Sequence, residues 1–173
     1  MIMKNLLTLA LSAAIALSPA VCGGGSGDGG PEVPGGSAGE NVQIPNPFAD
    51  YDSLADAAAA AGFELTVPEE IGGSPRRTIQ VMTTDPRMIQ IFYGDEDSRL
   101  CVRKAAGGED ISGDYNVYPQ VVTADVDGMS VTEKGRDDRV MVAVWSDGGY
   151  AYAVVSDAGM SAGDAAALIQ SIK

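Results

Sequence analysis

Short alternating segments separated by tight-turn residues constrain the fold of this chain more than any other feature. Asp127-Gly128 and Asp147-Gly148-Gly149 lie between such segments, and both are turn signals typical of β-hairpins. The segments occupy residues 78–83, 88–93, 99–104, 120–126, 129–134, 139–146 and 150–156. Connections this short join antiparallel neighbours, because a parallel crossover needs a dozen or more residues. The pattern therefore predicts a meandering antiparallel sheet of about six to seven strands.

Two helices are predicted at the ends of this sheet region. Each begins with a serine followed three residues later by an aspartate, Ser53 with Asp56 and Ser161 with Asp164, which is a variant of the capping box. Gly62 suits the left-handed position that ends the first helix. The predicted fold is therefore α+β, with the N- and C-terminal helices packed on one face of the sheet.

The N-terminal segment has the features of an export signal rather than of a folded element. Lys4 gives a positive start, and residues 6–17 form a charge-free apolar run. As a helix that run spans about 18 Å, which is too short for a hydrocarbon core of about 30 Å. We therefore expect an export signal at residues 1–21, a flexible Gly/Ser/Pro-rich tether at residues 22–45 and a single domain at residues 46–173.

Cys22 lies just after the apolar run and before a glycine-rich stretch. This arrangement resembles a bacterial lipoprotein, in which the cysteine becomes the lipidated first residue and makes the cell membrane a partner of the chain. The alternative is cleavage after Ala20, which leaves Cys22 as an ordinary exported thiol free to pair with Cys101. The first interpretation predicts an extracytoplasmic membrane lipoprotein, and the second predicts a secreted protein.

Composition excludes several classes of function. The chain carries 11 Lys and Arg against 24 Asp and Glu, giving a formal net charge of −13, so nucleic acid is not an expected partner. It has no histidine, which removes Ser-His-Asp and Cys-His nucleophiles and His-ligated metals. Two cysteines cannot complete a four-cysteine zinc site. We therefore expect no cofactor and no metal.

Acidic turns raise the question of calcium. Residues 95–97 and 125–128 are rich in aspartate, but neither stretch places an oxygen ligand or the required glycine at the EF-hand positions. Solvated turn acids are the expected interpretation, and a calcium site of another type is the alternative.

Several short motifs along the domain resemble those of a known family. They are NPF at residues 46–48, AGF at 61–63, VPE at 67–69, ISGDY at 111–115, KG at 134–135 and WSDGGYAY at 145–152. Over residues 46–173 the chain is similar to an uncharacterised family of bacterial extracytoplasmic domains that occur as lipoproteins or in anti-sigma-factor-like membrane proteins. The resemblance implies export and an α+β domain. It carries over no catalytic residue, because none is established for that family.

The longest irregular stretch of the sheet region, about residues 105–119, is the candidate ligand loop. Asp114, Tyr115, Asn116 and Tyr118 offer polar and stacking groups suited to a glycan or a peptide. Long loops on a rigid scaffold often carry function. The alternative is a loop that covers the edge of the sheet with its tyrosines half in the core.

Cys101 alternates with apolar residues between Arg99 and Arg103 on the predicted polar face of its strand. The two positive charges should give its thiolate some stabilisation. Without a histidine base, however, a free or Cys22-paired structural cysteine is the better interpretation.

These observations predict a non-enzymatic exported domain that binds or senses an extracytoplasmic ligand or protein. Two alternatives remain. The first is a small secreted hydrolase using paired carboxylates, which requires a cleft with two facing acids of raised pKa. The second is a carrier of an apolar ligand between sheet and helices, which requires a large dry cavity there.

Overall fold

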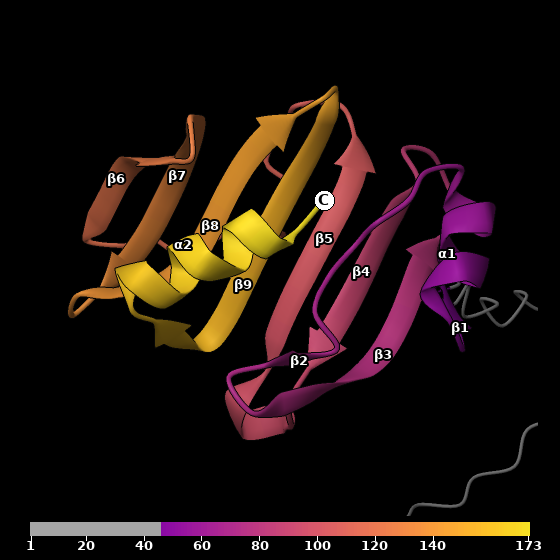
Figure 1. Ribbon diagram of the computed structural model, residues 1–173, viewed down its shortest axis with the longest axis horizontal. Coiled ribbons are helices and arrows are strands. Elements are labelled where there is room, and N and C mark those ends of the chain that lie inside the picture. The colour runs from indigo at the N-terminus through magenta and orange to yellow at the C-terminus, as the bar shows by residue number, and fades with distance from the viewer. Residues whose placement is uncertain (1–45) are drawn as a thin grey trace, which may run out of the picture. The chain divides into compact units, whose positions relative to one another are not determined.

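The computed structural model describes residues 46–173, which form an antiparallel sheet of nine strands and two helices (Figure 1). The strands are β1 (Phe48–Tyr51), β2 (Glu70–Ile71), β3 (Ser74–Met82), β4 (Met88–Tyr93), β5 (Leu100–Ala106), β6 (Gln120–Val126), β7 (Met129–Arg136), β8 (Arg139–Asp147) and β9 (Tyr150–Met160). The helices are α1 (Leu54–Ala61) and α2 (Ala162–Ser171), and a short 3₁₀ turn, η1, covers Glu96–Ser98.

The sheet consists of two meanders that meet at β5 and β9. Its strand order is β1-β3-β4-β5-β9-β8-β7-β6, with β2 paired to β3 at one side, and every pairing is antiparallel. The chain leaves β5, crosses to the far edge at β6 and then returns strand by strand to β9. The expected antiparallel meander is confirmed within each half.

The expected count of about six to seven strands was too low. All the predicted segments are strands, and the two additional strands are β1 and β2. Both are short: β1 has four residues and β2 has two, so neither carries a visible alternation. They form because β3 is long enough to pair with both of them as well as with β4.

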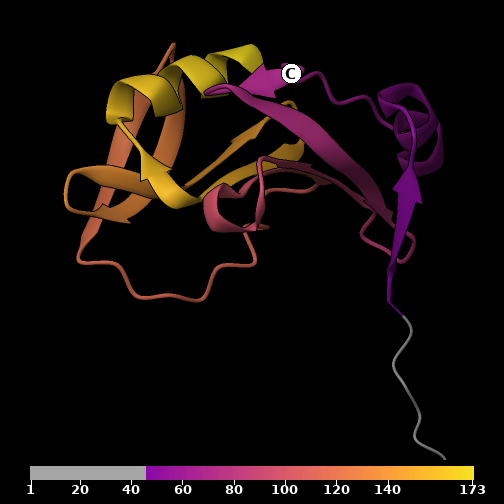
Figure 2. The ribbon, with the colours of Figure 1, turned by 90° about the horizontal axis from the view of Figure 1, so that it is seen from below.

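The predicted helix ends are confirmed. The Ser53 hydroxyl accepts the backbone N–H of Asp56 at 3.1 Å, and Ser161 does the same for Asp164 at the same distance. Gly62 ends α1 in the left-handed conformation, at φ 86°, with its N–H bonded to the Ala58 carbonyl. Figure 2 shows α1 and α2 on the same side of the sheet.

The main core lies between the sheet and these helices. Ala57 and Ala165 are fully buried, and as small side chains they let the helices lie close to the strands. The segment between α1 and β2 also covers this face with buried Leu65 and Val67. Thr66 of that segment exchanges two backbone hydrogen bonds with Lys173, at 2.9 and 3.1 Å, so the C-terminus closes the layer. We call this side of the sheet the helix face.

Neither helix among residues 46–173 is long and apolar enough to span a bilayer. The expected export signal, the tether and Cys22 lie outside the described residues.

Candidate functional site

The candidate loop was expected over about residues 105–119, but β5 extends to Ala106, so the loop spans residues 107–119. It crosses the side of the sheet opposite the helices, which we call the loop face (Figure 2). Arg103 of β5 fixes it there. Its guanidinium donates to the Ile111 carbonyl at 3.2 Å and also to the Ser112 carbonyl. Gly113 follows with φ 64°, and a side chain at this position would collide with the Arg103 guanidinium. The loop is therefore bound to the sheet through its own backbone.

Asp110 forms a second attachment of the loop. Its carboxylate accepts hydrogen bonds from the Lys134 ammonium at 2.7 Å and from the Ser112 N–H at 2.8 Å. Partial burial alone would raise the pKa of Asp110, but these hydrogen bonds outweigh it and hold the pKa below its ordinary value. The interaction links the loop to β7, which is three strands from Arg103 toward the β6 edge, with β9 and β8 in between.

Three of the four predicted ligand residues come together around one carboxylate. Asp114 accepts hydrogen bonds from the Asn116 backbone N–H and from the Tyr118 hydroxyl, both at 2.8 Å, and from the Asn116 side-chain amide at 3.3 Å. Burial is the largest single influence on the pKa of Asp114 and raises it, but the hydrogen bonds together lower it overall. Because the carboxylate is already satisfied within the loop, its first role is to hold the loop's shape.

A polar pocket of about 310 Å³ opens beside this cluster. Asp114, Asn116 and Tyr118 form one wall, and Arg136 and Asp157 contribute charge from the sheet. Tyr115 does not join them. Its side chain is 95% exposed, so the expectation of tyrosines half in the core is wrong for Tyr115, while Tyr118 is half-buried.

Exposed apolar side chains follow directly along the chain. Among residues 46–173, the exposed large hydrophobic residues are Tyr115, Val117, Val121 and Val122. They all fall between the tip of the loop and the first half of β6, which is a free edge of the sheet. Exposed apolar side chains gathered in one stretch of chain make that stretch a candidate interaction site. We call residues 115–126 the loop–edge segment.

The backbone of β6 also has unpaired hydrogen-bonding groups. A two-residue turn closes the β6–β7 hairpin, with Val126 opposite Met129. In such a hairpin the pair next to the turn is hydrogen-bonded, and bonded pairs then alternate along the ladder. The N–H and C=O groups of Val121, Thr123 and Asp125 therefore point away from β7, ready to accept another strand.

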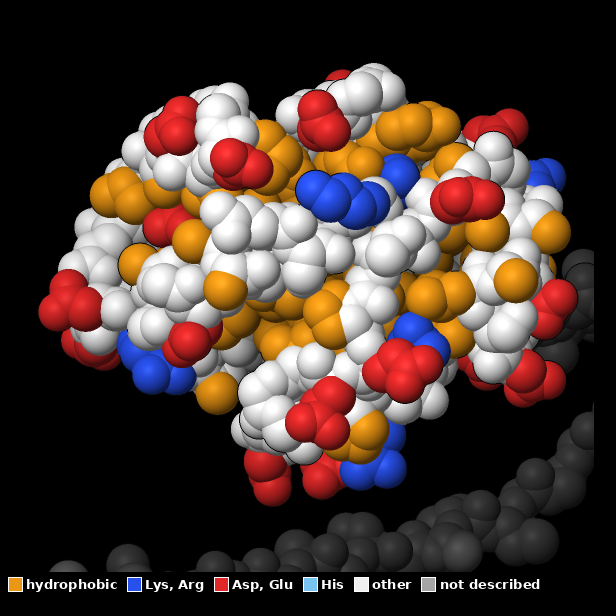
Figure 3. Space-filling model, in the orientation of Figure 1, with side chains coloured by type: hydrophobic (Ala, Val, Ile, Leu, Met, Phe, Trp, Pro, Cys, Tyr) orange, Lys and Arg blue, Asp and Glu red, His pale blue; other side chains and the backbone are white. Residues whose placement is uncertain are grey.

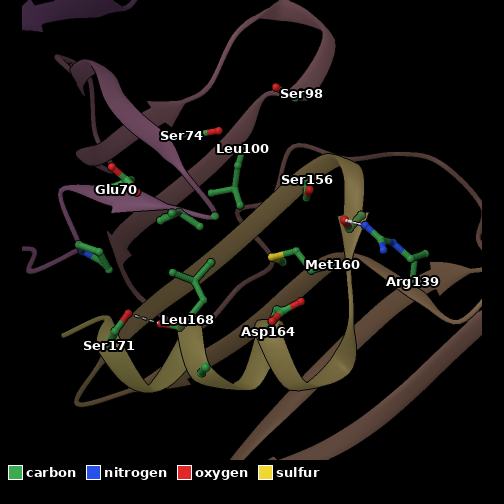
Figure 4. A pocket seen from close by; sticks show the side chains of 15 residues that line it. Glu70, Ser74, Ser98, Leu100, Arg139, Ser156, Met160, Asp164, Leu168 and Ser171 are labelled. Atoms are coloured by element: carbon green, nitrogen blue, oxygen red, sulfur yellow. Dashed lines mark hydrogen bonds between the residues drawn. The ribbon is translucent and has the colours of Figure 1, made fainter.

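A separate groove of about 550 Å³ lies on the helix face, between α2 and the β2–β3 hairpin (Figure 4). Leu100, Met160 and Leu168 point into it, and the Ser171 hydroxyl at one end donates to the Leu168 carbonyl at 2.6 Å. Figure 3 shows apolar side chains in the hollow beside α2. The groove is a depression in the protein surface above the core, and Glu70 and Asp164 are among its lining residues.

The pKa of the Cys101 thiol differs from the prediction. Cys101 does lie on the loop face, but it is 5% exposed, and burial raises the pKa of its thiol to about 11. Arg103 and Arg99 lower that pKa, though by less than burial raises it, so the expected stabilisation of the thiolate does not prevail. No pairing partner for this thiol is present among residues 46–173.

The described part of the chain contains no group of three or more Cys, Asp and Glu side chains placed to hold a metal ion. The aspartates of the acidic turns are exposed, and one of them, Asp95, forms a 3.1 Å ion pair with Arg77.

No protein-family model, curated protein or solved structure matches this chain. The argument for a functional role of the loop–edge segment therefore depends on the geometry of this structure alone. Sequence patterns identified the loop residues. They did not identify the free edge, because the far-edge position of β6 depends on which strands pair over long distances.

Proposed function

We propose that this chain is an exported, lipid-tethered, non-enzymatic domain that binds an extended, positively charged segment of another protein along β6. The observation that carries the proposal is the loop–edge segment, where exposed Val121 and Val122 lie on the free edge strand β6 and exposed Tyr115 and Val117 precede it in the loop. An added strand would use the unpaired backbone groups of β6 for hydrogen bonds and the valines for side-chain contacts.

Charge favours a cationic partner. The chain carries a formal net charge of −13, and several aspartates lie on and near β6. Asp125 lies on β6, Asp127 is in the turn that follows, and Asp137 and Asp138 form the next hairpin turn. Complementary potentials steer association and suppress partners of the same sign. Lysine and arginine side chains flanking an apolar centre therefore suit the partner segment.

A designed peptide tests the binding mode. The probe is a peptide of about seven residues, the length of β6, with alternating valine and lysine. Nuclear magnetic resonance should show the amides of Val121, Thr123 and Asp125 shifting on titration and becoming protected from exchange. A valine–glutamate peptide of the same length and the Thr123→Pro variant serve as controls. Proline removes an outward N–H on an edge strand without breaking the β6–β7 ladder.

The proposal fails if the valine–glutamate peptide binds equally well, if Thr123→Pro leaves binding unchanged, or if the perturbed amides lie elsewhere. Self-association through β6 would appear as a concentration-dependent sedimentation coefficient without peptide, and it would replace the proposed partner by a second copy of the chain.

The anchor is tested independently of binding. Cells expressing the chain are labelled with radioactive palmitate, and Cys22→Ala is compared with the unchanged chain. Incorporation that is lost in the variant supports the lipid anchor. Absence of label, with cleavage after Ala20, supports the secreted form.

The two alternatives have less support. A carboxylate hydrolase needs two facing acids of raised pKa; burial raises the pKa of Glu133, whereas the pKa values of Asp110 and Asp114 are lowered overall. A carrier needs space between sheet and helices, where Ile91, Val102 and Val154 are fully buried in a continuous side-chain cluster.

A further inference from the structure

A second surface cavity, of about 300 Å³, lies on the helix face where the N-terminus of α2 passes over β6, β7 and β8. Val122, Val140 and Ala162 form much of its wall. Glu133 of β7 also lines it. This cavity shares Arg139 with the groove at the β2–β3 hairpin and no residue with the pocket beside the loop.

Glu133 is unusual among the acids of the domain. Its side chain is buried, with 7% of the residue exposed, and it forms no side-chain hydrogen bond or ion pair with residues 46–173. No side-chain oxygen in this part of the chain is both sealed from solvent and unpartnered. The Glu133 oxygens therefore keep access to the cavity that the residue lines. A buried carboxylate without a partner is costly, which leaves it ready to accept one.

The neighbouring charges leave this carboxylate free. The Lys134 ammonium bonds Asp110 of the loop. Arg139 lines the cavity, but its guanidinium donates to the carbonyls of Ala158 and Gly159. The remaining charged residue of the lining, Asp138, is negative and exposed.

The N-terminus of α2 already has a negatively charged side chain beside it. A helix N-terminus attracts anions in general, but here the Asp164 carboxylate lies in the first turn and accepts the Ser161 hydroxyl at 2.7 Å. The cavity therefore offers the Glu133 carboxylate, which has no hydrogen-bonding partner among residues 46–173, beside apolar walls, with the Arg139 guanidinium directed to the carbonyls of Ala158 and Gly159.

We infer that this cavity is a binding site for a small alkylammonium group, with the ammonium paired to Glu133 and the alkyl part against Val122, Val140 and Ala162. A charge-assisted hydrogen bond to a carboxylate is stronger than a neutral one, and apolar walls favour an aliphatic body over a hydrated metal ion. The site does not depend on strand addition at β6.

The test uses the full chain and three probes of similar size: n-butylammonium, n-butanol and n-butyrate. Titration should shift the amide resonances of Val122, Val140 and Ala162 saturably with n-butylammonium. Glu133→Gln should weaken that binding by about ten-fold or more, as expected for loss of one charged hydrogen bond. Glu109→Gln removes the same charge from the exposed loop and should leave binding unchanged.

A second measurement covers the case in which Glu133→Gln fails to fold. In the unchanged protein the side-chain carboxyl resonance of Glu133 reports its titration, and n-butylammonium should lower that pKa whereas n-butanol should not. The inference is overturned if n-butanol binds as tightly as n-butylammonium, or if Glu133→Gln binds n-butylammonium as tightly as the unchanged chain does. It is also overturned if n-butylammonium leaves the pKa of Glu133 unchanged. A loss caused equally by Glu109→Gln would indicate only the overall charge of the domain.

Discussion

The guanidinium of Arg103 donates a hydrogen bond to the side-chain oxygen of Gln90, 3.1 Å away on the neighbouring strand. The contact continues outward, because Gln90 donates to Gln80 at 2.7 Å and Gln80 donates to Asp50 at 2.7 Å. The loop face thus carries a line of hydrogen bonds from β1 to β5, and Arg103 connects that line to the loop backbone.

Replacing Arg103 should release the loop. Arg103→Met keeps much of the aliphatic length but leaves two loop carbonyls and Gln90 without their donor. Loss of hydrogen bonds to a charged group should lower the free energy of unfolding by about 2 kcal/mol. Chemical denaturation measures that change, and hydrogen exchange should accelerate first in residues 110–118. Arg77→Met, which removes an exposed ion pair on β3, should change stability by less than about 0.5 kcal/mol. Equal effects of the two variants would contradict the anchoring role.

Acid should loosen the same loop before the sheet unfolds. The pKa values of Asp110 and Asp114 are lowered in the folded protein, so their contribution to stability is present above the unfolded pKa, near 4. That contribution is lost as the pH falls through the folded pKa values. Amide exchange in residues 110–118 should therefore rise below about pH 4 relative to the core strands. Asp110→Asn should show the loosening already at neutral pH, and an unchanged exchange pattern in this variant would count against the prediction.

Glu133 should have the opposite effect on the pH dependence of stability to that of Asp110 and Asp114. Burial raises its pKa, so the folded state disfavours the ionised form. The penalty is absent below the unfolded pKa, near 4.3, and is complete once the pH has risen through the folded pKa. Glu133→Gln should therefore stabilise the protein at pH 7 to 8, with the gain vanishing near pH 4. Thermal unfolding across this range measures it, with Glu109→Gln as the control that should show no such pH-dependent gain.

Cys101 should react slowly. With a thiol pKa of about 11, its thiolate fraction at pH 8 is roughly two orders of magnitude below that of a free cysteine. In a Cys22→Ser background, alkylation by iodoacetamide should be slower than that of glutathione by at least this factor. The same protein unfolded in guanidinium should react at the ordinary rate. A native rate close to that of glutathione would show that Cys101 is accessible and its pKa ordinary.

Local patterns predicted the strands and helix ends well because their causes are local. Ser53 and Ser161 cap helices through atoms three residues away, and Asp127 and Gly128 both adopt the positive φ that their hairpin turn needs. The adjacency of β5 and β9 was beyond such reasoning, since it joins segments about fifty residues apart and depends on the balance of the whole core.

The candidate site was predicted only in part for the same reason. Asp114, Asn116 and Tyr118 are close in sequence, so their clustering was within reach of a local argument. Glu133 alternates with Val131 on one face of β7, which could have signalled an acid on the core side. Its missing partner, however, depends on where Lys134 and Arg139 direct their charges.

The positions of the two sheet edges determine how the domain responds to a pulling force. The described chain begins beside β1 at one edge, and β6 is the other edge, seven strand spacings or about 34 Å away. A partner that pulls on β6 while the N-terminus is held would load the sheet at right angles to its strands. Such a load opens backbone hydrogen bonds one after another instead of shearing a whole ladder together. The domain should therefore yield at low force along this axis, and the four-pair β1–β3 ladder should open before the seven-pair β6–β7 ladder.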